Sequence, residues 1–130
     1  MKIGELCRSG DSKGEKHVPV ISTPEAVTAG VPFDVTVAVG TEIPHPNTTE
    51  HFIAWLDLYF KPLGEAFAYH AGHSDFRAHG ESTRGANEGP IRAHPKATFS
   101  VEISKPGTLV AVSMCNIHGL WESSVDLDLS

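Results

Sequence analysis

Three short clusters in this chain contain side chains that bind metal ions: residues 15–19 (EKHVP), 45–51 (HPNTTEH) and 115–119 (CNIHG). Structural zinc is satisfied by four ligands in tetrahedral geometry. Four nitrogens plus one sulfur instead suit a metal with a higher coordination number that changes its redox state. The clusters supply such a set and therefore predict one redox iron, with the candidate donors His17, His45, His51, His118 and Cys115.

Each cluster has a second interpretation when it is taken alone. Prolines on both sides of His45 exclude it from a helix, so His45 and His51 belong to a loop that leads into a strand at Phe52, and polar loops often contain histidine. Cys115 and His118 could reach one metal across a turn, or they could be a buried strand cysteine and an unrelated surface histidine. A nucleophilic pair is also possible, but no third orienting residue is evident. The clusters become persuasive only together.

The elements that must position these residues are strands. Apolar residues alternate with other residues over 33–39, 97–103 and 125–129, and residues 109–115 are rich in β-branched and small apolar types. Residues 52–60 are apolar on both faces apart from Asp57, which predicts a central strand covered on both sides. Gly and Pro mark turns at 28–32, 61–64 and 105–107, and residues 81–90 read as a loop. This pattern predicts an all-β fold, an antiparallel sandwich or small barrel.

Length and composition bound the possible functions. A chain of 130 residues predicts a single domain spanning 1–130, in which residues 1–14 form an ordered arm or loop. The formal charge of -6 disfavours nucleic acid, and no apolar run is long enough for a membrane span. The first residues lack the apolar region of a secretory signal, so we expect a cytoplasmic protein in which Cys7 and Cys115 are free thiols.

With these motifs in order along the chain, the sequence resembles superoxide reductase of the neelaredoxin type. The resemblance covers most of the chain, from Ser9 to Glu122. It implies an immunoglobulin-like antiparallel β-barrel and a one-electron reduction of superoxide to hydrogen peroxide at a mononuclear non-haem iron. By carry-over the four equatorial ligands would be His17, His45, His51 and His118. Cys115 would be the axial thiolate, Glu15 the sixth ligand of the ferric state and Lys16 a catalytic lysine.

The resemblance also implies the assembly and the partners. One subclass has a second, N-terminal iron centre built from four cysteines, but this chain has only Cys7 there, so it is similar to the one-iron class, with one Fe per chain. Rubredoxin or a similar small redox protein would supply the electrons, and a homotetramer is expected. Neighbours in an extended strand point to opposite sides, so we infer that residues 14–18 form a loop that presents Lys16 or Glu15 in turn.

Two rival functions share part of the pattern. A cupredoxin-like electron carrier also has a late Cys-x-x-His, but a blue-copper site usually adds an axial methionine, and none follows Met114. A structural zinc ion takes four ligands, so it would leave one of the five candidate donors unused. We expect Trp55 and Trp121 in the core or in the wall of the site. We expect the remaining histidines at polar surface or strand-edge positions: His70, His73, His79 and His94. The His70-x-x-His73 pair could hold an adventitious metal.

Overall fold

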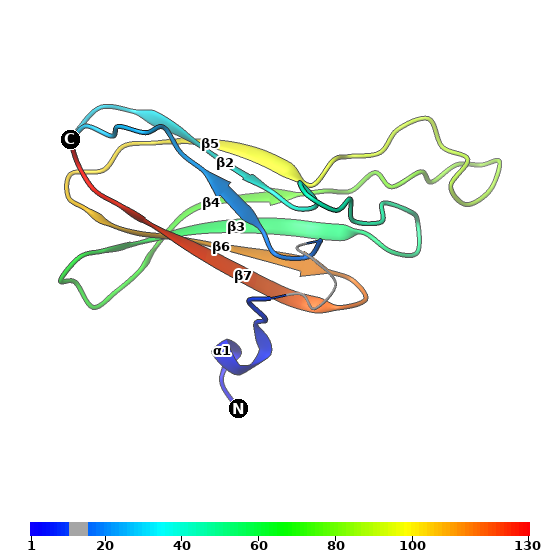
Figure 1. Cartoon of the computed structure of the whole chain (residues 1–130). Coiled ribbons are helices and arrows are strands. Elements are labelled where there is room, and N and C mark those ends of the chain that lie inside the picture. The colour runs from blue at the N-terminus through cyan, green and yellow to red at the C-terminus, as the bar shows by residue number, and fades with distance from the viewer. Residues whose placement is uncertain (11–15) are drawn as a thin grey trace.

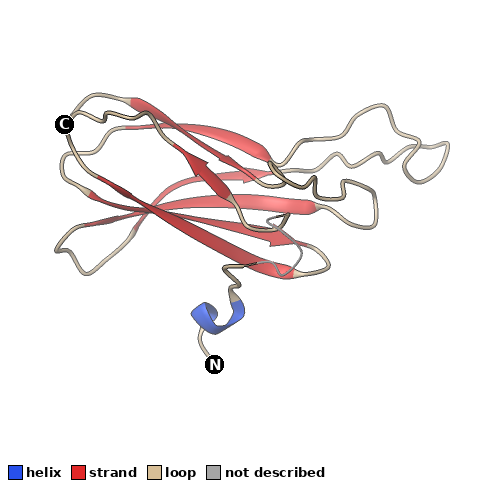
Figure 2. Cartoon of the chain, in the orientation of Figure 1, coloured by secondary structure: helices blue, strands red, loops and turns tan. Residues whose placement is uncertain are grey.

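Two antiparallel β-sheets face each other across the hydrophobic core (Figures 1 and 2). The computed structural model describes residues 1–10 and 16–130. The smaller sheet has the order β1-β2-β5, and the larger sheet has the order β4-β3-β6-β7. The predicted all-β, immunoglobulin-like sandwich is confirmed. The strands are β1 (Val20–Ser22), β2 (Phe33–Ala38), β3 (Ile53–Pro62), β4 (Tyr69–Asp75), β5 (Lys96–Val101), β6 (Gly107–Cys115) and β7 (Gly119–Leu127).

The core follows from the period of two in the strands that the sequence predicts. Val35 and Val37 of β2 are fully buried, and Leu56 and Leu58 of β3 face them from the other sheet. In β6 every second residue from Gly107 to Cys115 is buried. Because successive side chains in a strand point to opposite faces, this alternation places the Cys115 side chain on the core side of its sheet.

The structure departs from the sequence prediction at three of its strands. No strand was expected at β1 or β4; β4 escapes notice because its sequence, YHAGHSD, has no apolar alternation. Strand β3 is central, between β4 and β6, as predicted. Its expected coverage on both faces is wrong, because Trp55, Asp57 and Tyr59 on the outer face remain partly exposed. Trp55 therefore lies on the outside of the sheet and not in the core or the site wall.

The N-terminal arm contains a short helix, α1 (Ile3–Leu6), and then runs beside β7. The Arg8 amide donates to the Leu120 carbonyl, and the Glu122 amide donates to the Arg8 carbonyl. Residues 11–15 lie outside the described part of the chain, and with them Glu15. No helix in the described part has the length and apolar character needed to cross a membrane.

One end of the sandwich gathers the predicted metal ligands. There β6 ends at Cys115, β7 begins at Gly119, and the loop that follows β2 leads into β3 (Figure 1). The opposite end contains the turn between β3 and β4 (Figure 1). The register of β3 and β6 pairs Ile53 with Cys115, so the segment that contains His51 comes next to the β6–β7 turn.

Candidate metal centre

His17 lies in the segment that precedes β1 and is 5% exposed. Residues 16–18 form a bend, and Pro19 disfavours a helical backbone at Val18. The Ser113 hydroxyl, itself buried on β6, donates to the His17 carbonyl at 3.0 Å. The Ser123 hydroxyl of β7 donates to the Pro19 carbonyl. Two hydroxyls of the larger sheet thus fix the backbone at His17 and two residues after it.

His45 is oriented by its own loop. Its Nδ1 lies 2.7 Å from the Pro46 carbonyl, so Nδ1 carries the proton and donates it. Its Nε2 is buried and has no hydrogen-bond partner in the described structure. The loop folds back closely on Gly40, which has φ +83°, and a Cβ there would lie 2.8 Å from the His45 nitrogen. The loop therefore presents a bare, lone-pair nitrogen in the interior.

Asn116 ties the His51 loop to the β6–β7 turn. Its side-chain amide donates to the Glu50 carbonyl at 2.9 Å, and its side-chain oxygen accepts from the Phe52 amide at 2.9 Å. The Thr48 hydroxyl accepts from the His51 amide within the loop. These contacts hold His51 Nε2 at 3.2 Å from Cys115 Sγ.

The four imidazoles form a closed ring. Successive ring centroids are 4.9 Å apart for His17 and His45, 4.8 Å for His45 and His51, 5.1 Å for His51 and His118, and 4.8 Å for His118 and His17. Donor atoms of His17, His45, His51 and Cys115 all lie within 4.8 Å of one another. His118, the exposed member on the β6–β7 turn, brings Nδ1 to 3.2 Å from His17 Nε2 and 3.8 Å from Cys115 Sγ.

The two faces of this ring differ in their exposure to solvent. Cys115 is fully buried, so its sulfur approaches the imidazoles from the core, while His118 and the half-buried Lys16 are on the solvent side. The His118 amide also points at Cys115 Sγ, at 3.4 Å. A hydrogen bond to a ligating sulfur tunes the redox potential of a bound metal. Trp121 stacks on His17 with a centroid distance of 4.6 Å and walls one edge, as expected.

The electrostatics of the ring favour the neutral imidazole at His45 and at His51. Burial lowers the pKa of His45 to about 4, assisted by the nearby His17, His51 and Lys16 and opposed by the bond to the Pro46 carbonyl. Burial also lowers the pKa of His51, and the neighbouring His118, His17 and Lys16 add to this shift. Neutral imidazole is the form that binds metals. The same shifts indicate that the Lys16 ammonium lies near enough to act on the ring.

The side chains of this ring offer the donor atoms that a bound metal ion needs. The buried, unpartnered His45 Nε2 would be costly unless it found a partner, and a metal ion at the centre of the ring provides one. Neutral nitrogens with one sulfur are donors for a redox-active transition metal. His17, His45, His51, His118 and Cys115 are thus brought together, whereas Glu15 lies outside the described residues.

His79 is the residue whose position sequence reasoning misjudged. It was expected at the surface, yet it is only 2% exposed. Its Nδ1 lies 2.7 Å from the Asn47 side-chain oxygen, its Nε2 lies 2.7 Å from the Phe76 carbonyl, and its ring stacks on Phe52 at 3.9 Å. Asn47 in turn donates to the Ala93 carbonyl. His79 therefore supports the loop between His45 and His51 through its contacts with Asn47 and Phe52. The sequence offers no periodic signal for this role.

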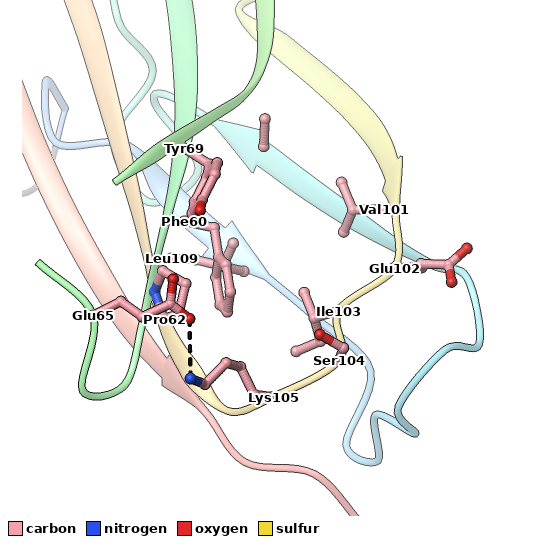
Figure 3. Close-up of a pocket in the computed structure, with 11 residues that line it drawn as sticks. Phe60, Pro62, Glu65, Tyr69, Val101, Glu102, Ile103, Ser104, Lys105 and Leu109 are labelled. Carbon is pink, nitrogen blue, oxygen red and sulfur yellow. Dashed lines mark hydrogen bonds and ion pairs between the residues drawn. The ribbon is translucent and has the colours of Figure 1, made fainter. Parts of the chain in front are cut away.

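The other three histidines lie away from the ring. His70, His73 and His94 are exposed, as predicted. A separate cavity of about 540 Å³ lies near the turn between β3 and β4, lined mainly by apolar side chains and bordered by the ion pair of Lys105 and Glu65 (Figure 3). None of the ring residues lines this cavity. The cavity therefore has no part in the candidate metal centre.

Comparisons with known proteins agree with this geometry. The family model for desulfoferrodoxin matches residues 9–124. The chain is 53% identical over 124 residues to neelaredoxin from Megalodesulfovibrio gigas, covering 95% of each chain. It is also 53% identical over 126 residues to superoxide reductase from Pyrococcus furiosus, covering 97% of this chain and 99% of the relative.

Solved structures give the same result. A crystal structure of superoxide reductase in the oxidized state superposes with a TM-score of 0.90 at 52% identity, covering 98% of this chain and 100% of the other. The reduced superoxide reductase (neelaredoxin) of Archaeoglobus fulgidus gives 0.87 at 48% identity, covering 95% and 99%. Fold and site define a β-sandwich oxidoreductase with a His/Cys metal centre. The chain belongs to the desulfoferrodoxin family, among its superoxide reductases.

Proposed function

We propose that the chain is a superoxide reductase, which adds one electron and two protons to superoxide and yields hydrogen peroxide. The observation that supports this most strongly is the ring of four imidazoles over a buried thiol, in a chain about half identical to superoxide reductases. The cupredoxin-like alternative is not favoured, because its copper site needs fewer histidines than the ring contains.

We assign the holding of iron to His17, His45, His51 and His118 around the ring and to Cys115 from the core side. A ferrous ion bound there would supply the single electron that superoxide accepts. The chain contributes the environment: the buried sulfur of Cys115 is an electron-rich donor on one side, and the solvent-facing side is left for a small anion. One such centre per chain is proposed, because the described residues contain one group of this kind.

Lys16 is proposed to attract the substrate. The chain has a formal charge of -6, which repels an anion at long range. The half-buried Lys16 places a positive charge beside the ring, where it also contributes to the lowered pKa of His51. Glu15, by its likeness to the family's carboxylate, is proposed to supply a sixth oxygen ligand once the iron is ferric.

We infer that the electron comes from outside the chain, since the described residues contain no second metal-binding group with cysteine beside the ring. We propose rubredoxin or a similar small redox protein as the donor. A homotetramer is proposed from the family resemblance, and it accords with the strong exposure of Leu63 and Phe67. A cytoplasmic location is proposed because Cys7 and Cys115 form no disulfide, as expected in a reducing compartment. Light scattering would test the assembly.

The experiment that tests the reaction is a product balance. The iron-loaded protein should remove superoxide and form hydrogen peroxide without dioxygen, in proportion to the electrons taken from an added reductant. Sustained loss of superoxide with release of dioxygen and no reductant would instead identify a dismutase.

A further inference from the structure

A second group of metal-binding side chains lies on the outer face of the larger sheet. Asp57 of β3 and His73 of β4 are directly opposite each other in the strand pairing. His70 is three residues before His73, a spacing that would place the two side chains on opposite faces of a regular strand. The pairing shifts between Leu58 and Tyr59, so that Gly72 pairs with Leu58 and His70 pairs with Tyr59.

This β-bulge turns His70 to the face that His73 occupies. Ala71 is the unpaired residue of the bulge, and it is followed by Gly72, where a Cβ would come within 2.3 Å of the Phe99 ring. Bulges re-aim side chains and often accompany functional sites. The backbone of β4 is therefore shaped so that two imidazoles share one face of the sheet.

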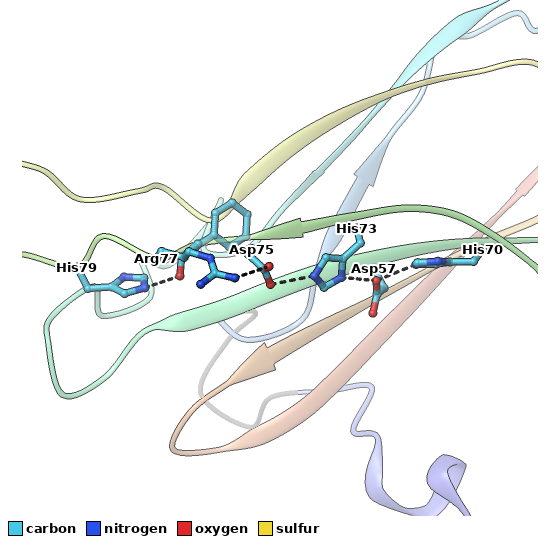
Figure 4. Close-up of polar contacts among 7 residues, drawn as sticks. Asp57, His70, His73, Asp75, Arg77 and His79 are labelled. Atoms are coloured by element: carbon cyan, nitrogen blue, oxygen red, sulfur yellow. Dashed lines mark hydrogen bonds and ion pairs between the residues drawn. The ribbon is translucent and has the colours of Figure 1, made fainter.

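Both imidazoles converge on the same carboxylate oxygen (Figure 4). His70 Nε2 is 2.9 Å and His73 Nδ1 is 2.7 Å from Asp57 Oδ1. Asp57 is the most enclosed of the three, with its side chain 14% exposed, while the two imidazoles are open to solvent at 51% and 41%. An ion arriving from solvent would thus reach the nitrogens first and the carboxylate behind them.

A second carboxylate supports His73 from its far side. His73 Nε2 lies 2.8 Å from Asp75 Oδ1, and Arg77 lies 3.3 Å from the other Asp75 oxygen (Figure 4). A carboxylate that accepts the remote N–H of a ligating imidazole fixes the ring and raises its basicity, and such partners recur at zinc sites. Here it would leave Nδ1 as the ligand atom that faces Asp57.

We propose that Asp57, His70 and His73 form a second, peripheral site for a divalent transition-metal ion such as Zn²⁺, distinct from the iron centre. Two imidazoles, one carboxylate and a water molecule make an open four-coordinate zinc site. Ligand atoms around a tetrahedral zinc lie about 3.3 Å apart, so the two imidazoles need to withdraw from Asp57 Oδ1 by roughly half an ångström and to bring their facing nitrogens closer to each other. The exposed imidazoles have room for this movement.

The test measures zinc binding to the iron-loaded protein by calorimetry in a non-chelating buffer. The iron and zinc contents of the protein are then measured after gel filtration. We expect one zinc per chain in addition to the retained iron. The double variant His70→Ala/His73→Ala should lose this zinc. Asp75→Asn should weaken binding about tenfold, as removal of a supporting partner does at other metal sites.

His94→Ala is the matched control, because His94 is an exposed histidine outside the cluster and its removal should leave zinc binding unchanged. Three results would overturn the proposal: no zinc taken up beyond the iron, zinc taken up only as iron is lost, or undiminished zinc in the double variant. The single variant His70→Ala keeps the carboxylate network of His73 intact, and it should also weaken binding if the folded double variant proves hard to obtain.

Discussion

The two histidine clusters of this protein place the same side chain in opposite environments. In the ring at the end of the sandwich, burial lowers the pKa of His45 and His51 and keeps their imidazoles neutral. On the outer sheet face, hydrogen bonds to Asp57 and Asp75 raise the pKa of His73. The ring combines nitrogen with a buried sulfur, whereas the surface group combines nitrogen with carboxylate oxygen.

This difference in partners accounts for the difference in chemistry. Nitrogen with thiolate sulfur suits a metal that changes oxidation state, and a fully buried sulfur is protected from solvent. Two imidazoles with a carboxylate oxygen, open to solvent, can bind a divalent ion such as Zn²⁺ at the surface. The number of histidines is a poor guide to function; what surrounds each ring decides what it does.

Removal of the buried sulfur should have the largest effect. In Cys115→Ser we expect the iron centre to lose the visible absorption of its oxidised form and to turn over at least about 100-fold more slowly, since even outer partners of metal ligands are worth 10–100-fold. Absorption spectra and steady-state reduction of superoxide would measure both. Cys7→Ser is the control and should match the wild type. A Cys115→Ser protein that retains its colour and its rate would show that the Cys115 sulfur is not a ligand of the iron.

Loss of the support behind the ring should come next. His79→Gln removes the stacking on Phe52 and one of the two ring hydrogen bonds, so the loop between His45 and His51 is held less firmly. We expect iron affinity to fall about 10–100-fold while the ligands remain. Competition with a chelator would measure it, and the exposed His94→Gln serves as control. Unchanged iron retention in His79→Gln would show that the loop holds its shape without this residue.

The neutral state of His45 should appear in the stability of the iron-free protein. Its folded pKa, about 4, is below the value of about 6.5 expected when unfolded, so protonation favours the unfolded chain. The stabilisation is present above pH 6.5 and is lost as the pH falls toward 4, by up to about 2 kcal/mol at pH 5. Urea unfolding at pH 7 and pH 5 would measure it. His45→Asn should lack this part of the slope, and an identical slope in both proteins would contradict the assignment.

Lys16→Ala should lower the second-order rate with superoxide by a few-fold, about the size of a single charge acting on an anion near the site. The wild-type rate should also fall as salt rises, because screening weakens the attraction. Pulse radiolysis at low and high ionic strength would measure both, with the exposed Lys96→Ala as control. Glu15→Ala should leave this rate unchanged and alter only the ferric spectrum. An equal loss in both variants would refute the division of labour between the two residues.

The smallest effect concerns the surface group. Because the pKa of His73 is raised in the folded protein, its interaction with the two aspartates is present below pH 6.5 and is lost as the pH rises through the folded value. NMR titration of the His73 ring should give a pKa above the usual one. Asp75→Asn should lower it toward the ordinary range. A pKa of His73 at or below that of a solvated histidine would show that the two clusters do not differ in this respect.

The sequence predicts most of the sandwich and the identity of the ring residues, because strand alternation and clustered donors are local signals. It predicts neither β4 nor the role of His79. The bulge that places His70 and His73 on one face depends on the pairing of β4 with β3, which a single strand does not reveal. The burial of His79 depends on Asn47, 32 residues earlier in the chain. Contacts between distant segments decide both cases.

The central claim, that four imidazoles and one sulfur hold a single iron, is tested most directly by iron K-edge X-ray absorption of the reduced protein with metal analysis on the same sample. We predict one iron per chain with a shell of four nitrogen scatterers and one sulfur, and loss of the sulfur scatterer in Cys115→Ser. A four-coordinate shell, a shell without sulfur in the wild type, or zinc in place of iron would contradict the account.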